Sequence, residues 1–290
     1  MAAQKHEKHQ KKEPDDKIPP ESPISTKMEK KQVEERTAIG AAVVYEAIRM
    51  EGEDELRRPA QALAWSGLAA GLSMGFSFIA EGLLAAYLPN EPWAHLISRL
   101  GYSVGFLIVV LGRQQLFTEN TLTVILPLLA HRSRTVLNRV LKLWAIVLVT
   151  NVAGTYLFAL CVAHVPIFEP PVRQALIAIG KAHLNLGFGE VFIGAIFAGW
   201  LIALMVWLLP AAESARVSII VLITYLIGLG SFGHVIAGST TVLFLVALKT
   251  TSWGAYLGSF FLPTLLGNII GGVSLVAALG HAQVVGGREG

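Results

Sequence analysis

The chain has 290 residues, of which 53% are hydrophobic and only 15% are charged, and its mean hydropathy is +0.58. About a quarter of the residues of a soluble chain are charged, so this composition excludes an ordinary soluble domain. Residues 1–58 hold 25 of the 43 formally charged side chains, and no aspartate follows Asp54. The net charge of +3 disfavours a nucleic-acid partner, and the single cysteine, Cys161, excludes an intrachain disulfide and a cysteine metal site. We therefore predict a polar tail joined to a membrane domain that carries no cofactor.

The N-terminal tail has two parts. Residues 1–32 are nearly all polar and predict a disordered, charged cytoplasmic tail, because they offer little apolar surface to bury. They also lack the apolar core of a cleavable signal peptide. From Val33 to Gly52 apolar residues recur at helical spacing. We predict that residues 33–58 form an amphipathic helix at the cytoplasmic surface, with a partner-binding helix as the alternative.

Six apolar stretches follow, and crossing about 30 Å of hydrocarbon takes about 20 helical residues. Four of them are free of charged residues: 59–80, 143–168, 191–212 and 250–287. The other two are interrupted: 100–130 by Arg113 and Glu119, and 217–248 by four glycines and His234. The pattern predicts an all-α membrane domain at 59–282, with six transmembrane helices of which the second and fifth are broken. Residues 283–290 would form a short C-terminal tail.

Basic residues near the span ends orient this domain, because cytoplasmic loops are enriched in lysine and arginine. Six spans place both termini on one side. That side would hold eight basic residues: Arg57, Arg58, Arg132, Arg134, Arg139, Lys142, Arg216 and Arg288. The other side would hold four: Arg99, Arg173, Lys181 and Lys249. We predict a multi-pass protein of the bacterial inner membrane with both termini in the cytoplasm.

The two interrupted spans indicate an internal repeat. Each is second in a group of three, and each is followed by an Asn-x-x-Gly step, which begins at Asn151 in one half and at Asn268 in the other. These asparagines lie 33 residues after Thr118 and 34 after His234. Three crossings per half make the halves inverted, and broken helices at matching places in inverted repeats point to a transport site near the midplane. The alternative is that glycine is simply common in membrane helices.

The breaks hold the candidate functional side chains. Unpaired backbone groups are tolerated in a membrane only where they line a cavity or are buried in protein. Thr118, Glu119 and Asn120 follow the first break, where Thr118 or Asn120 is expected to cap the next half-helix. His234, at the second break, is a functional candidate because ionisable groups are costly in a membrane; a satisfied core histidine is the alternative. Arg113 would guard the passage or, as we favour, bind loop carbonyls.

Three motifs resemble those of the formate/nitrite transporter family. Leu116-Phe-Thr-Glu-Asn-Thr-Leu122 resembles the Leu-Phe-Thr-Gly-Asn loop of the family's broken second helix. Trp200-Leu, followed by Val206-Trp207, resembles its fourth-helix motif, and Gly230-Ser-Phe-Gly-His234 resembles its Gly-Phe-Glu-His loop. The likeness covers about residues 33–282 and indicates the divergent YfdC-like branch.

The resemblance implies an aquaporin-like fold, a homopentamer and a separate pore in each subunit for a small monovalent anion such as formate or nitrite. Thr118 matches the threonine of the first loop, His234 the central histidine, and Lys181 the lysine of the vestibule. The apolar constrictions would fall at Phe106, Leu116 and Ile227.

The sequence departs from the family pattern around the histidine. Gly233 replaces the preceding glutamate, Gly238 replaces an asparagine, and Gly199 stands where the fourth span usually has asparagine. Glu119 occupies a position that is normally small. We hypothesise that Glu119 partners His234.

These features predict a transporter or channel for a small anion or its conjugate acid, proton-linked through His234 or its water network. Two alternatives remain: a channel for small neutral solutes, and a non-transporting scaffold. An enzyme is disfavoured, since the sequence shows no nucleophile with a positioned base, no His-Glu-x-x-His spacing and no phosphate-binding glycine loop.

Overall fold

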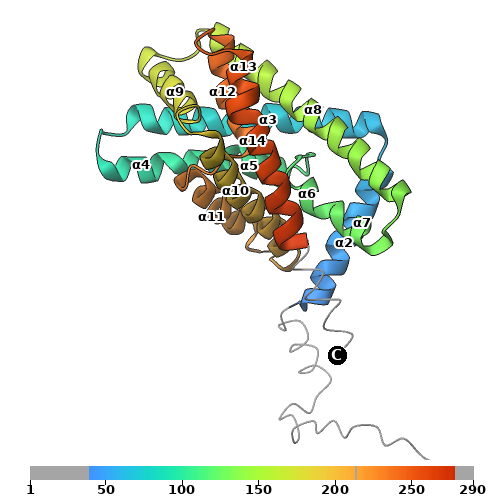
Figure 1. Ribbon diagram of the computed structural model, residues 1–290. Coiled ribbons are helices and arrows are strands. Elements are labelled where there is room, and N and C mark those ends of the chain that lie inside the picture. Colours follow the sequence, from blue (N-terminus) through green and yellow to red (C-terminus); the bar gives the residue numbers. More distant parts are fainter. Residues whose placement is uncertain (1–38, 213, 278–290) are drawn as a thin grey trace, which may run out of the picture. The chain divides into compact units, whose positions relative to one another are not determined.

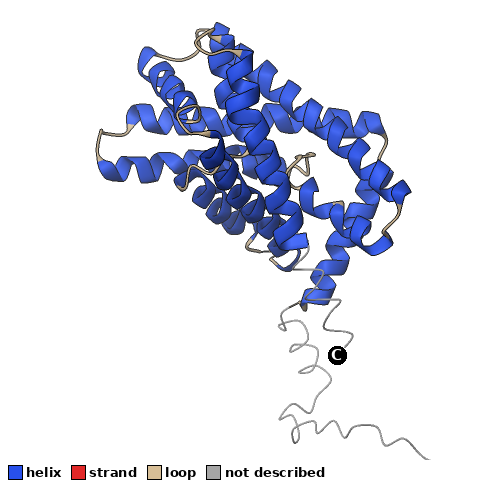
Figure 2. Cartoon of the chain, in the orientation of Figure 1, coloured by secondary structure: helices blue, strands red, loops and turns tan. Residues whose placement is uncertain are grey.

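The computed structural model describes residues 39–212 and 214–277, and all regular structure within them is helical (Figures 1 and 2). The first helices are α2 (Ala41–Arg57), α3 (Ala60–Tyr87), α4 (Pro92–Ser98), η1 (Arg99–Tyr102), α5 (Ser103–Leu111), α6 (Asn120–Thr123), α7 (Ile125–His131) and α8 (Arg134–His164). They are followed by α9 (Pro170–Ala182), α10 (Phe188–Leu208), η2 (Leu209–Ala211), α11 (Arg216–Leu229), α12 (Val235–Ala247), α13 (Trp253–Ala255), η3 (Tyr256–Phe261), α14 (Leu262–Ile270) and η4 (Gly271–Ala277). The predicted all-α class is confirmed, while the predicted tails at 1–32 and 283–290 lie outside the described residues.

Five helical segments are long and apolar enough to cross a membrane: Ala60–Tyr87, Pro92–Leu111, Arg134–His164, Phe188–Ala211 and Trp253–Ser274. Shorter apolar helices flank the two interruptions: Asn120–His131, Arg216–Leu229 and Val235–Ala247. The chain leaves helix between α5 and α6 and again between α11 and α12. The second and fifth spans are therefore broken, as the interruptions in the sequence predicted.

Several boundaries differ from the predicted ones. α3 continues seven residues past 80 because Glu81 is buried and forms an ion pair with Arg99, so that its charge is compensated inside the protein. Glu81 is thus neither solvated nor a helix cap. α8 begins at Arg134, where the Ser133 hydroxyl accepts a hydrogen bond from the Thr135 amide at 3.2 Å. α9 occupies a connection for which no helix was predicted.

The two halves pack in the same way. α3 runs along α8 in the first half and α10 runs along α14 in the second (Figure 1). At each crossing a glycine faces the backbone of an asparagine: a Cβ at Gly71 would lie 2.1 Å from the Asn151 carbonyl oxygen, and one at Gly199 would lie 2.4 Å from that of Asn268. Small residues are what allow such close approach of membrane helices. Gly199, which replaces the expected asparagine, is thus required by packing.

The breaks repeat the same backbone geometry. Arg113 and Ser231, which lie 118 residues apart, both have φ of 50°, a left-handed conformation that is uncommon for residues other than glycine. The preceding amides also match: Gly112 donates to the carbonyl of Ile108, four residues earlier, and Gly230 likewise bonds to the fourth residue before it. The inverted repeat therefore extends to single hydrogen bonds.

Candidate functional site

Asn151 of α8 anchors the first break. Its Oδ1 accepts a hydrogen bond from the Phe117 amide at 2.9 Å. Its Nδ2 donates to the carbonyls of Gly67 and Gln115, both at 2.8 Å. Asn151 is fully buried, so one amide side chain satisfies loop backbone groups that have left the helix. It ties α3, the loop and α8 together.

Asn268 of α14 anchors the second break with the same three bonds. Its Oδ1 accepts from the Val235 amide at 2.8 Å, and its Nδ2 donates to the carbonyls of Ala195 and Gly233, both at 2.8 Å. Asn268 is also fully buried. The Asn-x-x-Gly steps, noticed as markers of a repeat, thus hold the loops in place.

These bonds set the register between the two loops. The amides of Phe117 and Val235 each donate to the Oδ1 of their own anchoring asparagine, so these two residues occupy equivalent positions. The residues before them, Leu116 and His234, are therefore equivalent too. The repeat therefore does not make Thr118 and His234 equivalent, although each precedes its asparagine by a similar number of residues. A contact between Thr118 and His234 is therefore asymmetric with respect to the internal repeat.

That contact exists. The Oγ1 atom of Thr118 and the Nε2 atom of His234 lie 2.7 Å apart, and both residues are fully buried. His234 is also the N-cap of α12, where its Nδ1 accepts a hydrogen bond from the Ala237 amide at 3.1 Å. A nitrogen that accepts carries no hydrogen, so the hydrogen of the neutral ring is on Nε2 and is donated to Thr118. The expectation that Thr118 or Asn120 caps the first half-helix was wrong, since α6 has no side-chain cap.

The pair lies in an apolar part of the protein interior. The rings of Phe106 and His234 meet edge to face, with centroids 5.0 Å apart. Phe106, Leu116 and Ile227 are all 0% exposed and belong to one buried cluster. The three predicted constriction residues therefore lie in the protein interior, and a solute passing here would lose its water.

A hydroxyl pair that no sequence motif marks joins the two broken helices. Ser103 of α5 and Thr224 of α11 are buried, and their hydroxyl oxygens lie 2.8 Å apart. Each was hidden in an otherwise apolar run, with no break or ionisable neighbour to mark it.

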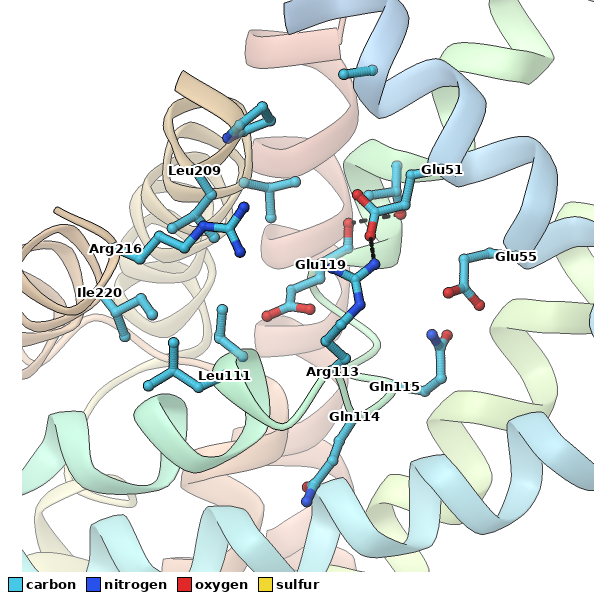
Figure 3. Close-up of a pocket in the computed structure, with 15 residues that line it drawn as sticks. Glu51, Glu55, Leu111, Arg113, Gln114, Gln115, Glu119, Leu209, Arg216 and Ile220 are labelled. Carbon is cyan, nitrogen blue, oxygen red and sulfur yellow. Dashed lines mark hydrogen bonds and ion pairs between the residues drawn. The ribbon is translucent and has the colours of Figure 1, made fainter. Parts of the chain in front are cut away.

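The first break opens into a cavity of about 290 Å³, which we name the inner cavity because α2 lines one side of it (Figure 3). Its charged and amide lining residues are Glu51, Glu55, Arg113, Gln114, Gln115, Glu119 and Arg216. Oε1 of Glu119 and Oε1 of Gln114 are buried and have no hydrogen-bond partner among the described residues. These two residues thus bring unsatisfied acceptors to the wall of the cavity, which favours partners that donate hydrogen bonds.

Glu119 does not pair with His234. Both ring nitrogens of His234 are engaged, by Thr118 and by the Ala237 amide, whereas Glu119 lines the inner cavity. The hypothesis of a Glu119–His234 pair is therefore wrong, because other groups already bond both nitrogens of the histidine and the carboxylate has no hydrogen bond to it.

Arg113 has a different partner from the one expected. Its guanidinium donates to Oε1 of Glu51 on α2 at 2.5 Å (Figure 3). Within the described residues, the guanidinium does not bond to loop carbonyls or to Glu119. α2 is thereby tied to the first break, a link between distant segments that the sequence did not show.

Asn120 is engaged within its own turn. Its Nδ2 donates to Oε1 of Gln115 at 3.0 Å, and its Oδ1 accepts from the Thr123 hydroxyl at 3.2 Å. Asn120 is only 3% exposed. These two hydrogen bonds hold the loop around Thr118 in one conformation.

A second pocket, of about 20 Å³, opens at the other break and has room for about one water. Its lining residues are His183, Leu186, Glu190, Val191, Gly194, Ser231, Gly233 and Phe260. The beginning of α10 lies at this pocket and its end lies at the inner cavity, so the two are at opposite ends of the helix. Lys181 is exposed near the end of α9 and is not part of this lining, whereas His183 is.

The fold and the site together define a multi-pass membrane protein of the transporter class, with two broken helices meeting between cavities at opposite ends. A sequence model of the formate/nitrite transporter family matches residues 42–282. The chain belongs to this family, one of transporters and channels and not of enzymes.

Individual relatives agree. The inner membrane protein YfdC of Escherichia coli is 43% identical over 251 residues, which cover 87% of this chain and 81% of YfdC. The formate channel BtFdhC of Bacillus thuringiensis is 26% identical, covering 80% of this chain and 91% of that protein. Among solved structures, a pentameric formate channel with formate bound matches with a TM-score of 0.64 at 20% identity, over 76% of this chain and 95% of the other. The predicted family, YfdC-like branch and fold are confirmed.

Proposed function

We propose that this protein carries a small monovalent anion of the formate or nitrite kind across the bacterial inner membrane as its conjugate acid. Each subunit of a homopentamer has its own pathway, and both termini lie in the cytoplasm. The proposal draws on the relatives named as a formate channel, a pentamer and an inner membrane protein. The observation that carries it is the buried, hydrogen-bonded Thr118–His234 pair, which contacts Phe106 and lies between two cavities.

Energetics favour passage of the neutral acid. Protonating an acid of pKa about 4 at pH 7 costs about 4 kcal/mol. Carrying the charged anion past the buried apolar side chains of Phe106, Leu116 and Ile227 costs far more, because these side chains do not solvate a charge. Transport is then linked to one proton per anion.

Within this mechanism Thr118 is the donor to the substrate. Because Nε2–H of His234 donates to Oγ1 of Thr118, the hydroxyl hydrogen of Thr118 is left to bond a carboxylate or nitrite oxygen. A proton on Nδ1 of His234 would face the N–H of Ala237. Two donors cannot bond each other, so the N-cap hydrogen bond of α12 would be lost. We therefore propose that water in the cavity supplies the transferred proton. The neutral histidine holds the Thr118 hydroxyl in place through its hydrogen bond. Lys181 attracts the anion outside, and Asn120 keeps the loop rigid.

Glu119 favours a second candidate, a channel for small neutral solutes. An ionised carboxylate in the inner cavity repels anions, while its unsatisfied oxygen accepts hydrogen bonds from an uncharged solute. Flux of such a solute would not depend on the pH gradient, which separates the two candidates.

A flux assay in proteoliposomes tests the proposal. Formate and nitrite uptake are measured with and without an inward proton gradient for the wild type, His234→Ala and Glu119→Gln. We expect gradient-driven uptake in the wild type and strong loss in His234→Ala. Equal flux in all three proteins would remove both residues from the mechanism, and gradient-independent flux would favour the neutral-solute channel.

A further inference from the structure

A separate cavity of about 370 Å³ lies where the corner between α2 and α3 meets the beginning of α8. It does not include any residue of the two breaks. Its lining residues are Glu55, Leu56, Arg57, Arg58, Ala60, Leu63, Arg139, Lys142, Leu143 and Ile146. Four cations therefore face it against one carboxylate.

Two of these cations are neutralised by neighbours on the same helix. Arg58 pairs with Glu55 at 3.0 Å, and Arg57 pairs with Asp54 at 3.3 Å and Glu53 at 3.4 Å. The acidic residues of α2 are thus already engaged and do not neutralise the other wall of the cavity.

The other two cations, Arg139 and Lys142, have no such partner. Both are exposed on α8, one helical turn apart, and neither forms a hydrogen bond or ion pair with the residues that the structure describes. Like charges at this spacing repel each other and destabilise a helix. An anion held between them would remove the repulsion.

The rest of the lining is apolar. Leu63 and Leu143 are 4% and 2% exposed, and Ile146 continues the same face of α8. The long apolar run of α8 begins at Leu143, so the two cations stand at its edge, where lipid headgroups lie. On α3, Trp65 is 65% exposed near the same end, as is typical of aromatic residues at the membrane interface.

We propose that this cavity binds the phosphodiester headgroup of an anionic phospholipid of the cytoplasmic leaflet. Arg139 and Lys142 hold the phosphate, and the acyl chains run along the apolar surface of α3 and α8. Basic pockets between membrane helices on the cytoplasmic side recognise such headgroups. A free phosphate matches the cations but leaves the apolar wall uncovered, so the lipid is the better fit. This inference does not depend on the proposed substrate.

Native mass spectrometry and lipid-induced thermal shifts of the purified full chain test it. Phosphatidylglycerol and phosphatidylcholine with identical acyl chains are compared, with inorganic phosphate as a third ligand. We expect phosphatidylglycerol to bind and raise the melting temperature, and the other two to have little effect. In Arg139→Gln/Lys142→Gln the affinity for phosphatidylglycerol should fall about thirtyfold, from the loss of two charges near the phosphate.

The matched control is Arg132→Gln/Arg134→Gln, which removes two exposed charges from the same region but outside the cavity. It should bind phosphatidylglycerol like the wild type, and both variants should retain the oligomer on size exclusion. Three results would overturn the proposal: equal binding of phosphatidylcholine, unchanged binding in the Arg139/Lys142 variant, or displacement of the lipid by inorganic phosphate. So would a cross-link from Lys142 to a neighbouring subunit, because protein would then cover the cavity.

Discussion

Thr118 and His234 stand 116 residues apart in the chain, and their side chains meet at 2.7 Å in the buried centre of the protein. The histidine caps α12 through its other nitrogen, which leaves Nε2–H directed at the threonine hydroxyl. The internal repeat equates His234 with Leu116, so the polar pair breaks the symmetry of the scaffold that holds it.

Thr118→Val tests the donor role. Valine keeps the shape but leaves Nε2–H of His234 buried without an acceptor, a penalty of about 1–3 kcal/mol. It also removes the hydroxyl proposed to bind the substrate, so we expect formate flux to fall at least tenfold in proteoliposomes. Thr118→Ser, which retains the hydroxyl, should keep most of the flux. Equal flux in the two variants would contradict the role.

Asn151→Ala and Asn268→Ala should have similar effects, because each asparagine makes the same three hydrogen bonds. With about 1 kcal/mol per bond, each variant should lose about 3 kcal/mol of stability. Thermal unfolding in detergent measures this. Asn138→Ala, at an exposed position of α8, is the control and should melt like the wild type. A loss in only one of the two variants would argue against equivalent anchors.

Gly71→Ala and Gly199→Ala should both disrupt helix packing. The added methyl would overlap the carbonyl oxygen of Asn151 or Asn268, so the helices must separate, at a cost of about 1–3 kcal/mol or more. We expect lower yields of folded protein on size exclusion. Gly258→Ala is the control, since nothing lies within 4 Å of its Cβ position. Wild-type yields for Gly71→Ala and Gly199→Ala would show that the crossings are looser than described.

The buried Glu81–Arg99 ion pair predicts non-additive mutations. Arg99→Met leaves the Glu81 carboxylate buried without its partner and should cost about 3–5 kcal/mol. The double variant Arg99→Met/Glu81→Leu removes both charges and should recover most of that loss. Thermal unfolding of Arg99→Met, Glu81→Leu and the double variant measures the coupling. A double variant whose loss of stability equals the sum of the two single losses would mean that the residues act independently.

The contact between α2 and α7 should weaken in acid. The hydrogen bond from His131, at 2.8 Å, and the charge of Arg49 hold the pKa of Glu53 below its usual range. A carboxyl with a depressed pKa stabilises the fold above its unfolded pKa of about 4.3, and this contribution is lost as the pH falls through the lower folded value. Hydrogen exchange in α2, corrected for intrinsic rates, should therefore rise below about pH 4.3 in the wild type. Glu53→Gln should show a smaller pH dependence, and equal profiles would exclude this contact as the cause.

Much of this protein follows from the sequence alone. The apolar stretches and their interruptions predicted the all-α membrane class and the two broken spans, because a helix must satisfy its own backbone in lipid. The breaks marked Thr118 and His234, and the Asn-x-x-Gly steps marked the repeat. These features are local, so spacing and residue type are enough to detect them.

The partners of the polar side chains needed the tertiary structure. Glu119 turns to the inner cavity, Arg113 reaches Glu51 on α2, and Glu81 meets Arg99. The register of the two loops also came from the asparagine bonds and not from counting residues. A sequence pattern gives the face of a helix on which a side chain lies. Which opposite charge or donor it meets depends on how the helices cross, and packing between segments far apart in the chain decides that.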